Sequence, residues 1–200
     1  MAQATTLQPT LAGSLWPEQS ANKILRYGVL MVVGSLLLTL AAKVQVPFYP
    51  VPMTMQTLVV LGIGMAYGWR LGGATVLLYL AEGAAGLPVF AGTPEKGIGL
   101  AYMLGGTGGY LLGFVLAAGI CGRLAEMGWD RNVLTTALAM FIGNVVIYVP
   151  GVLWLGALFG WDKPILEWGL TPFLYGDLMK LVLAAIILPL AWQLVRRKKS

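Results

Sequence analysis

The stretch "TPFLYGDLMKLVLAAIILPLAW" (residues 171–192) is hydrophobic enough to cross a bilayer, yet it contains an acid, Asp177, and a base, Lys180. A charged side chain at the centre of a transmembrane helix costs about 2.5–3.5 kcal/mol on insertion scales. Residues three apart lie on one face of a helix, so both charges lie on the same face. The stretch predicts a transmembrane helix, ending near Leu194, whose charged pair needs a partner or a ligand.

The whole chain has the composition of an integral membrane protein. Of its 200 residues, 58% are hydrophobic and only 10% are charged, whereas about a quarter of the residues in a soluble domain are charged. A transmembrane helix needs ~20 apolar residues, so the length predicts about six spans and leaves no room for a catalytic module. We expect an all-α membrane protein, with residues 1–22 as a flexible cytoplasmic tail and 23–200 as a single six-helix membrane domain.

The side-chain inventory excludes several kinds of function. The chain has no histidine and a single cysteine, Cys121, so neither a metal site nor a protein-bound cofactor is expected. It lacks the G-x-x-x-x-G-K-[ST] motif of ATP-binding loops. Because no Ser–His pair or metal-ligand cluster exists, the chain is not expected to be an enzyme. Four of its basic residues form the terminal "RRKK" after a hydrophobic span, which is typical of a segment facing anionic lipid rather than of a nucleic-acid-binding protein.

The distribution of basic residues predicts the topology. Hydropathy and the positions of proline and glycine predict spans at 24–42, 53–67, 71–85, 107–124, 133–159 and 171–194. With the amino terminus in the cytoplasm, the inner segments hold nine of the thirteen Lys and Arg residues and the outer loops hold three, with Lys180 inside a helix. Both termini are therefore expected in the cytoplasm, and the protein is expected to be a multi-pass protein of the plasma membrane.

The three outer connections are long and rich in proline, glycine and aromatic residues. Irregular backbone at membrane depth persists only where it is buried in protein or lines a cavity. Asp177 and Lys180 lie ~9–14 Å along the last span from its outer end, at 1.5 Å per residue. The charged pair and the three outer connections are therefore expected to form an outward-facing pocket.

Two interpretations of the charged pair remain open. It is either an ion pair that attaches the last helix to a neighbour, or a split site in which Lys180 binds a ligand carboxylate and Asp177 accepts N–H donors. Asn144 and Tyr148, four residues apart, again share one helix face, and their polar groups suit either interhelical hydrogen bonds or a ligand.

The remaining candidates are equally open. Gln56, beside Thr54, either joins helices or contacts a ligand, and Glu82 either caps broken backbone or faces the cavity. Phe90 and Tyr110 are either pocket walls or ordinary interfacial aromatic residues. The residues themselves predict a small membrane protein that binds an amphipathic, anionic ligand, and they do not name that ligand.

Four stretches, in order along the chain, resemble a known family. They are "VPFYPVPMTMQTLVVLGIG" (46–64), "GLPVFAG" (86–92), "GGTGGYLLGF" (105–114) and "PFLYGDLMK" (172–180). Together they resemble BioY, the biotin-binding S component of energy-coupling-factor (ECF) vitamin transporters, over about residues 24–195. One departure is Gly106, where the family usually has proline.

The resemblance implies an S-component fold with six transmembrane helices, which captures biotin near the outer face and delivers it to the cytoplasm. It assigns biotin contact to Asp177 and Lys180, and we add the other candidate residues to the predicted binding set: Asn144, Tyr148, Gln56, Phe90 and Tyr110. The implied partners are a membrane coupling subunit and two ATPase subunits, which alone use ATP.

Partner contacts and transport mode are less closely defined by the sequence. Ser35 and Thr39, with Ala42 close by, form a face of small side chains suited to the coupling subunit or to packing within the bundle. The sequence leaves open whether the protein forms homo-oligomers and whether it works without the energising module. The alternatives are an S component for another vitamin, or a stand-alone ion-coupled carrier that uses Asp177 as a proton site.

Overall fold

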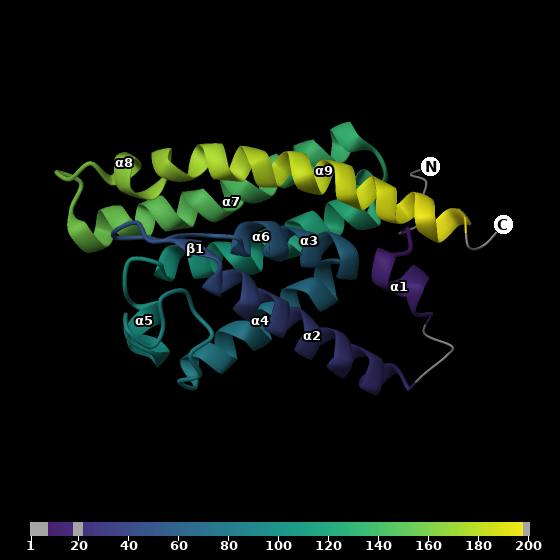
Figure 1. The fold of residues 1–200 in the computed structure, drawn as a ribbon, viewed down its shortest axis with the longest axis horizontal. Helices are drawn as coiled ribbons and strands as arrows, with labels where there is room; N and C mark the ends of the chain where they lie inside the picture. Colours follow the sequence, from purple (N-terminus) through teal and green to yellow (C-terminus); the bar gives the residue numbers. More distant parts are fainter. Residues whose placement is uncertain (1–7, 18–21, 198–200) are drawn as a thin grey trace, which may run out of the picture.

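Long helices run roughly along the molecule, and α1 lies at the same end as the last turns of α9 (Figure 1). The computed structural model describes residues 8–17 and 22–197. The α-helices are α1 (Leu11–Leu15), α2 (Lys23–Lys43), α3 (Gln56–Tyr67), α4 (Trp69–Ala84), α5 (Gly99–Met103), α6 (Gly108–Glu126), α7 (Val133–Phe159), α8 (Ile165–Gly169) and α9 (Leu174–Arg197). Two short 3₁₀ helices, η2 (Trp129–Arg131) and η3 (Thr171–Phe173), and an antiparallel pair of strands, β1 (Gln45–Val46) and β2 (Met53–Thr54), complete the described fold.

Four helical segments in the described part of the chain are long and apolar enough to cross a membrane. They are Lys23–Lys43, Gly108–Glu126, Val133–Phe159 and Ile165–Arg197. Helix α3 has 12 residues and α4 has 16, so at 1.5 Å per residue they reach only ~18 Å and ~24 Å, less than the ~30 Å hydrocarbon core. The prediction of a helical, multi-pass membrane protein is confirmed, and the count of six spans and the cytoplasmic position of the termini stay predictions.

Several element boundaries differ from the predicted spans by one to three residues, and the starts of α3 and α9 differ for a clear reason. Helix α3 begins at Gln56 rather than at residue 53, because Met53–Thr54 pairs with Gln45–Val46 in a short hairpin that the sequence did not predict. Helix α9 begins at Leu174 because the Pro172 segment forms the 3₁₀ helix η3 first. The start of the α9 helix therefore lies close to Asp177.

The amino-terminal segment is not a structureless tail where the structure describes it. Within residues 8–17, α1 begins with Thr10 Oγ1 accepting the Gly13 N–H at 3.1 Å, and the helix packs against α3 and α9. Arg131 Nη1 also donates to Gln8 Oε1 at 2.8 Å. This part therefore has a defined helix and contacts, the predicted flexibility of residues 1–22 stays a prediction, and residues 1–7 and 18–21 lie outside the described residues.

Helix α6 packs closely against α7 on one side and α3 on the other. A Cβ atom at Gly113 would lie 2.8 Å from the Cα of Ile147 on α7, and one at Gly64 would lie 2.5 Å from the carbonyl oxygen of Ala118. Only glycine permits such an approach of two backbones. This close packing positions the outer ends of α3, α6 and α7 around a common space.

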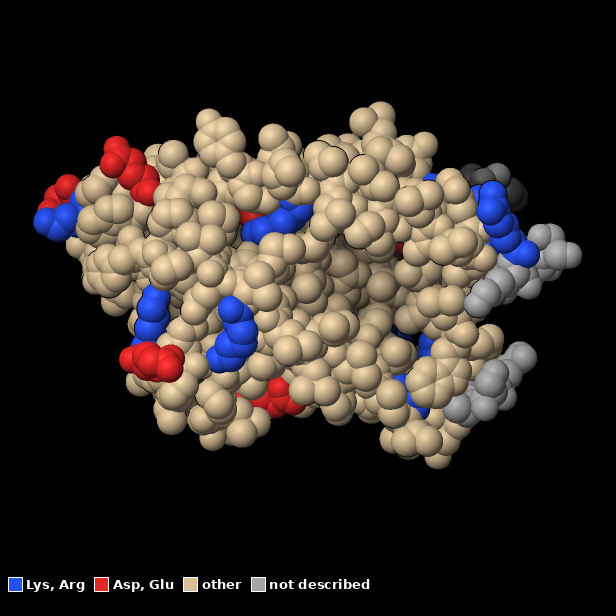
Figure 2. Space-filling model, in the orientation of Figure 1, with Lys and Arg blue, Asp and Glu red and all other residues tan. Residues whose placement is uncertain are grey.

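The charged side chains divide between the two ends of the molecule. The end of the molecule that holds α1 carries most of the basic residues. They lie at the start of α2 and of α4, at the end of α6 and of α9, and in η2. Figure 2 shows that basic side chains occur at both ends of this face, while its middle has little charge apart from one site beside α9 and an acidic patch at the lower edge. That uncharged middle is the surface expected to contact lipid.

Candidate ligand-binding site

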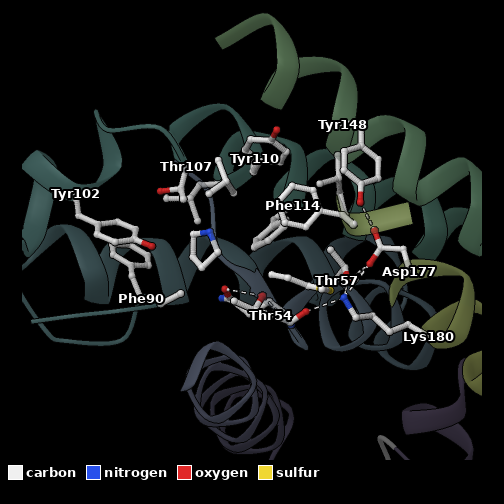
Figure 3. A pocket seen from close by; sticks show the side chains of 18 residues that line it. Thr54, Thr57, Phe90, Tyr102, Thr107, Tyr110, Phe114, Tyr148, Asp177 and Lys180 are labelled. Carbon is white, nitrogen blue, oxygen red and sulfur yellow. Dashed lines mark hydrogen bonds and ion pairs between the residues drawn. The ribbon is translucent and has the colours of Figure 1, made fainter. Parts of the chain in front are cut away.

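A small pocket lies where the hairpin, the start of α3, the segment before α6 and the start of α9 meet (Figure 3). Its free volume is about 50 Å³, room for a few water molecules at roughly 10–15 Å³ each on this measure. The walls are mainly apolar, and polar groups are concentrated at one end. The lining residues are Val51, Pro52, Met53, Thr54, Gln56, Thr57, Phe90, Ala91, Tyr102, Thr107, Tyr110, Leu111, Phe114, Ile147, Tyr148, Phe173, Asp177 and Lys180.

The polar end of the pocket is built around the Asp177–Lys180 ion pair. Lys180 Nζ lies 2.8 Å from Asp177 Oδ1, and both side chains are buried, being 9% and 5% exposed. Lys180 Nζ also donates to the Thr54 carbonyl oxygen at 2.7 Å and to Thr57 Oγ1 at 3.0 Å. An ammonium has three N–H donors, so every donor of Lys180 is occupied.

Asp177 connects three helices. Thr57 Oγ1 of α3 donates to Asp177 Oδ1 at 3.0 Å, and the Tyr148 hydroxyl of α7 donates to Asp177 Oδ2 (Figure 3). A carboxylate has about four lone-pair positions. The hydrogen bonds from Thr57, Tyr148 and Lys180 occupy three of those of Asp177. Asp177 can therefore accept one further N–H donor without losing a partner.

The opposite end of the pocket is aromatic. Phe90 stacks on Tyr102 with the ring centroids 4.9 Å apart and an interplanar angle of 13°. Phe90 also contacts the edge of Tyr79, whose hydroxyl accepts from Gln56 Nε2 at 2.7 Å and donates to the Val89 carbonyl oxygen at 3.1 Å. Gln56 is thus both a pocket residue and a link between α3, α4 and the segment that carries Phe90.

Tyr110 and Phe173 form a further aromatic wall beside Tyr148. The Tyr110 ring is perpendicular to that of Tyr148, with centroids 6.3 Å apart, and Phe173 lies 6.4 Å from Tyr148 on the same measure. The Tyr110 hydroxyl donates to the Gly169 carbonyl oxygen at 2.7 Å, so this residue offers the pocket its ring rather than its polar group.

Asn144 is the predicted binding residue that does not line the pocket. It faces a mostly apolar groove of about 650 Å³ between α7 and α9, which Tyr148 and Asp177 also border. Its Oδ1 atom is buried and has no hydrogen-bond partner among the described residues. Tyr148 therefore borders both spaces and Asn144 only the groove, so a joint role of the two residues in ligand binding stays a prediction.

The predicted partner-contact residues are also inside the bundle. Ser35 is 2% exposed and donates a hydrogen bond to Glu82, and Ala42 is 0% exposed. Thr39 is half-buried and donates to the Ser35 carbonyl oxygen. A residue without exposed surface cannot contact another subunit, so Ser35 and Ala42 serve packing within the bundle in this structure, whereas a partner contact by Thr39 stays a prediction.

The sequence did not identify several pocket residues as candidates. Thr57, Tyr102, Phe114 and Phe173 all line the pocket. Thr54 and Thr57 are three apart in an apolar segment, the same spacing that drew attention to Asp177 and Lys180. For Tyr102, Phe114 and Phe173 no such signal exists, since aromatic residues are common throughout membrane proteins.

A second cavity, of about 110 Å³, adjoins the aromatic end of the pocket. The two cavities share Pro52, Tyr102 and Thr107, and the second is also lined by Lys96. Lys96 is exposed and follows a turn that Lys43 holds from α2 by donating to the carbonyl oxygens of Phe90 and Thr93. The pocket therefore has a charged pair at one end and a second cation near the other.

Comparisons with known proteins agree on one family. A sequence model of the BioY family matches residues 14–197. A probable biotin transporter BioY of Pyrococcus horikoshii is 36% identical over 151 residues, covering 76% of this chain and 86% of that relative. The biotin transporter BioY of Thermotoga maritima is 37% identical over 152 residues, covering 76% and 86%. The fold matches a crystal structure of the S component for biotin from an ECF-type ABC transporter with a TM-score of 0.72 at 22% identity, covering 90% of this chain and 95% of that one.

Proposed function

The chain belongs to the BioY family, a family of membrane transporters rather than enzymes, and on that basis we propose that it is a biotin-binding S component. The observation that carries the proposal is the buried Asp177–Lys180 pair at one end of an otherwise apolar and aromatic pocket. Biotin combines a polar ureido ring, an apolar thiophane ring and a valerate carboxylate. An apolar pocket with a few fixed polar groups suits such a ligand.

The contact between the two charges determines which end of biotin suits them. Because Lys180 Nζ is only 2.8 Å from Asp177 Oδ1, a ligand carboxylate at Lys180 would also lie beside the Asp177 carboxylate and be repelled by it. The ureido ring carries an N–H donor next to a carbonyl acceptor, so it matches an adjacent carboxylate and ammonium. We therefore place the ureido ring at Asp177 and Lys180, in place of the split site expected from the sequence.

The valerate carboxylate then extends toward the other end of the pocket. That end continues past Tyr102 and Thr107 into the cavity lined by Lys96. An ammonium near the mouth of the pocket attracts a carboxylate while leaving it partly hydrated. Lys96 is accordingly the cation that we propose for the carboxylate end of the ligand.

Binding requires the pocket to widen. A space of about 50 Å³ is far smaller than a bicyclic vitamin with a side chain. The stacked Phe90 and Tyr102 rings and the hairpin beside Met53 form walls that can move without breaking a transmembrane helix. We propose that the ligand displaces these walls and that its ureido carbonyl replaces Thr54 or Thr57 as a hydrogen-bond acceptor of Lys180, while the Asp177–Lys180 ion pair is kept.

Equilibrium binding of labelled biotin to the purified protein tests the site. Wild type should bind tightly, and Asp177→Asn and Lys180→Ala should each lose roughly 30-fold or more in affinity, because truncating one partner of a desolvated charge pair costs about 2–5 kcal/mol. The exposed ion pair of Asp162 and Lys163, 3.1 Å apart, provides matched controls, Asp162→Asn and Lys163→Ala. Equal binding by all four variants would show that the Asp177–Lys180 pair is structural, and absence of wild-type binding in a folded sample would remove the biotin assignment.

The orientation of the ligand is tested by comparing biotin with its amide, which has no carboxylate charge. If the carboxylate lies near Lys96, Lys96→Gln weakens the binding of biotin and leaves that of the amide unchanged. Lys180→Gln then weakens both ligands alike, because its partner is the ureido ring. The reverse pattern, in which Lys180→Gln discriminates between the two ligands, would contradict the proposed orientation.

Energy for uptake is proposed to come from partner subunits. No ATP-binding loop motif occurs in the sequence, and the comparison structure was solved for a component of an ECF-type ABC transporter. We propose an outward-facing pocket, a membrane coupling subunit and two ATPases that drive delivery of biotin to the cytoplasm. Uptake in cells should then stop on ATP depletion, whereas sensitivity to an uncoupler at constant ATP would favour a stand-alone ion-coupled carrier.

A further inference from the structure

A separate cavity lies at the opposite end of the molecule, far along the helices from the candidate biotin site. Its volume is about 580 Å³, and it is enclosed by the α1 segment, the start of α2 and the turn between α3 and α4. Helix α2 is one of the segments long enough to cross a membrane. A cavity at its first turns is therefore at the level of the lipid headgroups.

Three cations from two helices line this cavity. Lys23 and Arg26 come from the first turn of α2, and Arg70 comes from the first turn of α4. Arg26 is only 3% exposed, and its guanidinium reaches α1, where Nη2 lies 3.9 Å from the position of a Cβ atom on Gly13. A guanidinium held in a cavity wall by packing is suited to bidentate binding of phosphate oxygens.

The carboxylate at the cavity is already engaged. Glu126 Oε1 accepts the Trp69 N–H at 3.2 Å, and Glu126 Oε2 pairs with Arg123 at 3.3 Å. Lys23 and Arg26 both lie over the Tyr27 ring, at 5.6 and 5.5 Å, and have further interactions within the chain. An added anion would thus share these cations with their existing partners. The cavity still has an excess of positive charge, because three basic side chains and one carboxylate line it.

The deeper wall of the same cavity is apolar. Met31 of α2 and Leu71 and Ala74 of α4 line it on the side toward the middle of the molecule. A cavity that is cationic at the membrane surface and apolar toward the membrane interior matches a phospholipid, whose phosphate adjoins its acyl chains. Inorganic phosphate would use the cations and leave the apolar wall uncovered.

We propose that this cavity is a binding site for a phosphate group, supplied by the headgroup of an anionic phospholipid. Arg26 and Arg70 bind the phosphate, Lys23 adds long-range attraction, and the apolar wall contacts the first part of an acyl chain. The site is separate from the biotin pocket and does not depend on what that pocket binds.

Lipid titration followed by native mass spectrometry of the detergent-solubilised full chain tests the proposal. Phosphatidylglycerol should bind more tightly than phosphatidylcholine with the same acyl chains, and Arg70→Gln and Arg26→Gln should each weaken phosphatidylglycerol about five-fold, the effect of one cation near a membrane surface. Arg197→Gln removes the same charge at the same end but outside the cavity, and should leave the affinity unchanged. Because Arg70 is exposed, its variant tests the site even if Arg26→Gln folds poorly, and circular dichroism verifies folding.

Soluble glycerol phosphate distinguishes the two sources of the phosphate. Weak competition by glycerol phosphate identifies the lipid as the ligand, and competition at similar concentrations identifies a free phosphate compound bound by the same cations. Equal phosphatidylglycerol binding by wild type, Arg26→Gln and Arg70→Gln would overturn the proposal. So would an equal loss in Arg197→Gln, because it would show attraction by the overall surface charge alone.

Discussion

Lys180 Nζ and Asp177 Oδ1 lie 2.8 Å apart, one turn apart on α9 and almost completely buried. The pair is attached to α3 through Thr54 and Thr57 and to α7 through Tyr148. The pair thus links α9 to its neighbours, as the ion-pair interpretation of the sequence expects, and it also lines one end of a pocket, where ligand binding stays a prediction. Structural and ligand roles can be separated by measuring stability without ligand and affinity with it.

Removing one member of the pair should destabilise the protein more than removing both. Asp177→Asn leaves the buried Lys180 ammonium without its counter-ion, and Lys180→Met does the same to the carboxylate, so each should cost about 3–5 kcal/mol of unfolding free energy. The double variant should cost less than the sum of the two. The measurement is denaturant unfolding of the ligand-free protein in detergent, and strictly additive effects would mean that the two charges are not coupled.

Tyr148→Phe should affect the Asp177–Lys180 end of the pocket, whereas Tyr110→Phe should not. The first change removes the hydroxyl that donates to Asp177 Oδ2, and the second removes one that donates to the Gly169 carbonyl oxygen. A hydrogen bond to a charged group contributes about 1.5–3 kcal/mol and a neutral one about 1 kcal/mol. We expect both variants to be less stable than wild type. Biotin affinity is then measured for each variant with and without Lys180→Ala. The loss of affinity caused by Lys180→Ala should differ from its wild-type value in Tyr148→Phe and not in Tyr110→Phe.

The sequence predicted most of the helices because their signals are local. The span 133–159 has the same bounds as α7, since both its ends are set by neighbouring polar or glycine residues. The strands Gln45–Val46 and Met53–Thr54 were not predicted. Strands of two residues pair only because the loop between them brings them together, and composition gives no signal for that. Likewise, the charge of Asp177 was visible in the sequence, while its contacts with Thr57 and Tyr148 join residues 120 and 29 positions apart.

The face of small residues on α2 shows where a pattern is ambiguous. Small side chains allow close approach equally to a helix of the same bundle and to a helix of another subunit. Only the fold distinguishes these two kinds of contact, because it buries Ser35 and Ala42 inside the bundle and pairs Ser35 with Glu82 of α4. The same limit applies to Asn144, which is correctly placed on the same helix as Tyr148 but borders the groove between α7 and α9.

Ala42→Leu tests the internal position of this face. Because Ala42 is 0% exposed, the larger side chain should overpack the bundle and lower the unfolding free energy of the isolated protein by about 1–3 kcal/mol. Leu40→Ala on the exposed side of the same helix, where Leu40 is 65% exposed, serves as the control and should change the stability little in detergent. A stable Ala42→Leu protein with impaired coupling to partner subunits would instead support the partner-contact interpretation.

Gly106→Pro should be tolerated and should stabilise the protein. A Cβ atom at Gly106 would meet only ordinary contacts at 3.5–3.6 Å, and Gly106 is not among the glycines with positive φ. Proline at a compatible position stabilises by about 0.4–1 kcal/mol because it restricts the unfolded chain. Biotin affinity should remain unchanged, measured beside unfolding, and a loss of stability would show that the local backbone requires glycine.

Asp130 should make stability depend on pH. It lies in η2, between the membrane-spanning helices α6 and α7, with no exposed surface. The Trp192 indole N–H donates to its Oδ2 atom, and the Arg131 guanidinium lies nearby, with Nε 3.9 Å from Oδ1. Burial nevertheless dominates over these two contacts and raises the pKa of Asp130 above its ordinary value of 3.8.

The sign of the pH effect follows from the raised pKa. Between pH 3.8 and the raised pKa, the folded protein holds a proton on Asp130 that the unfolded chain has lost, so the contribution of this group to stability decreases as the pH rises through that range. Asp130→Asn is neutral at every pH and lacks this dependence. The free energy of unfolding of wild type should therefore fall relative to Asp130→Asn as the pH rises from 3.8 through the raised pKa. A difference that is constant over this range would contradict the assignment, and one that changes in the opposite sense would mean that Arg131 and Trp192 outweigh burial.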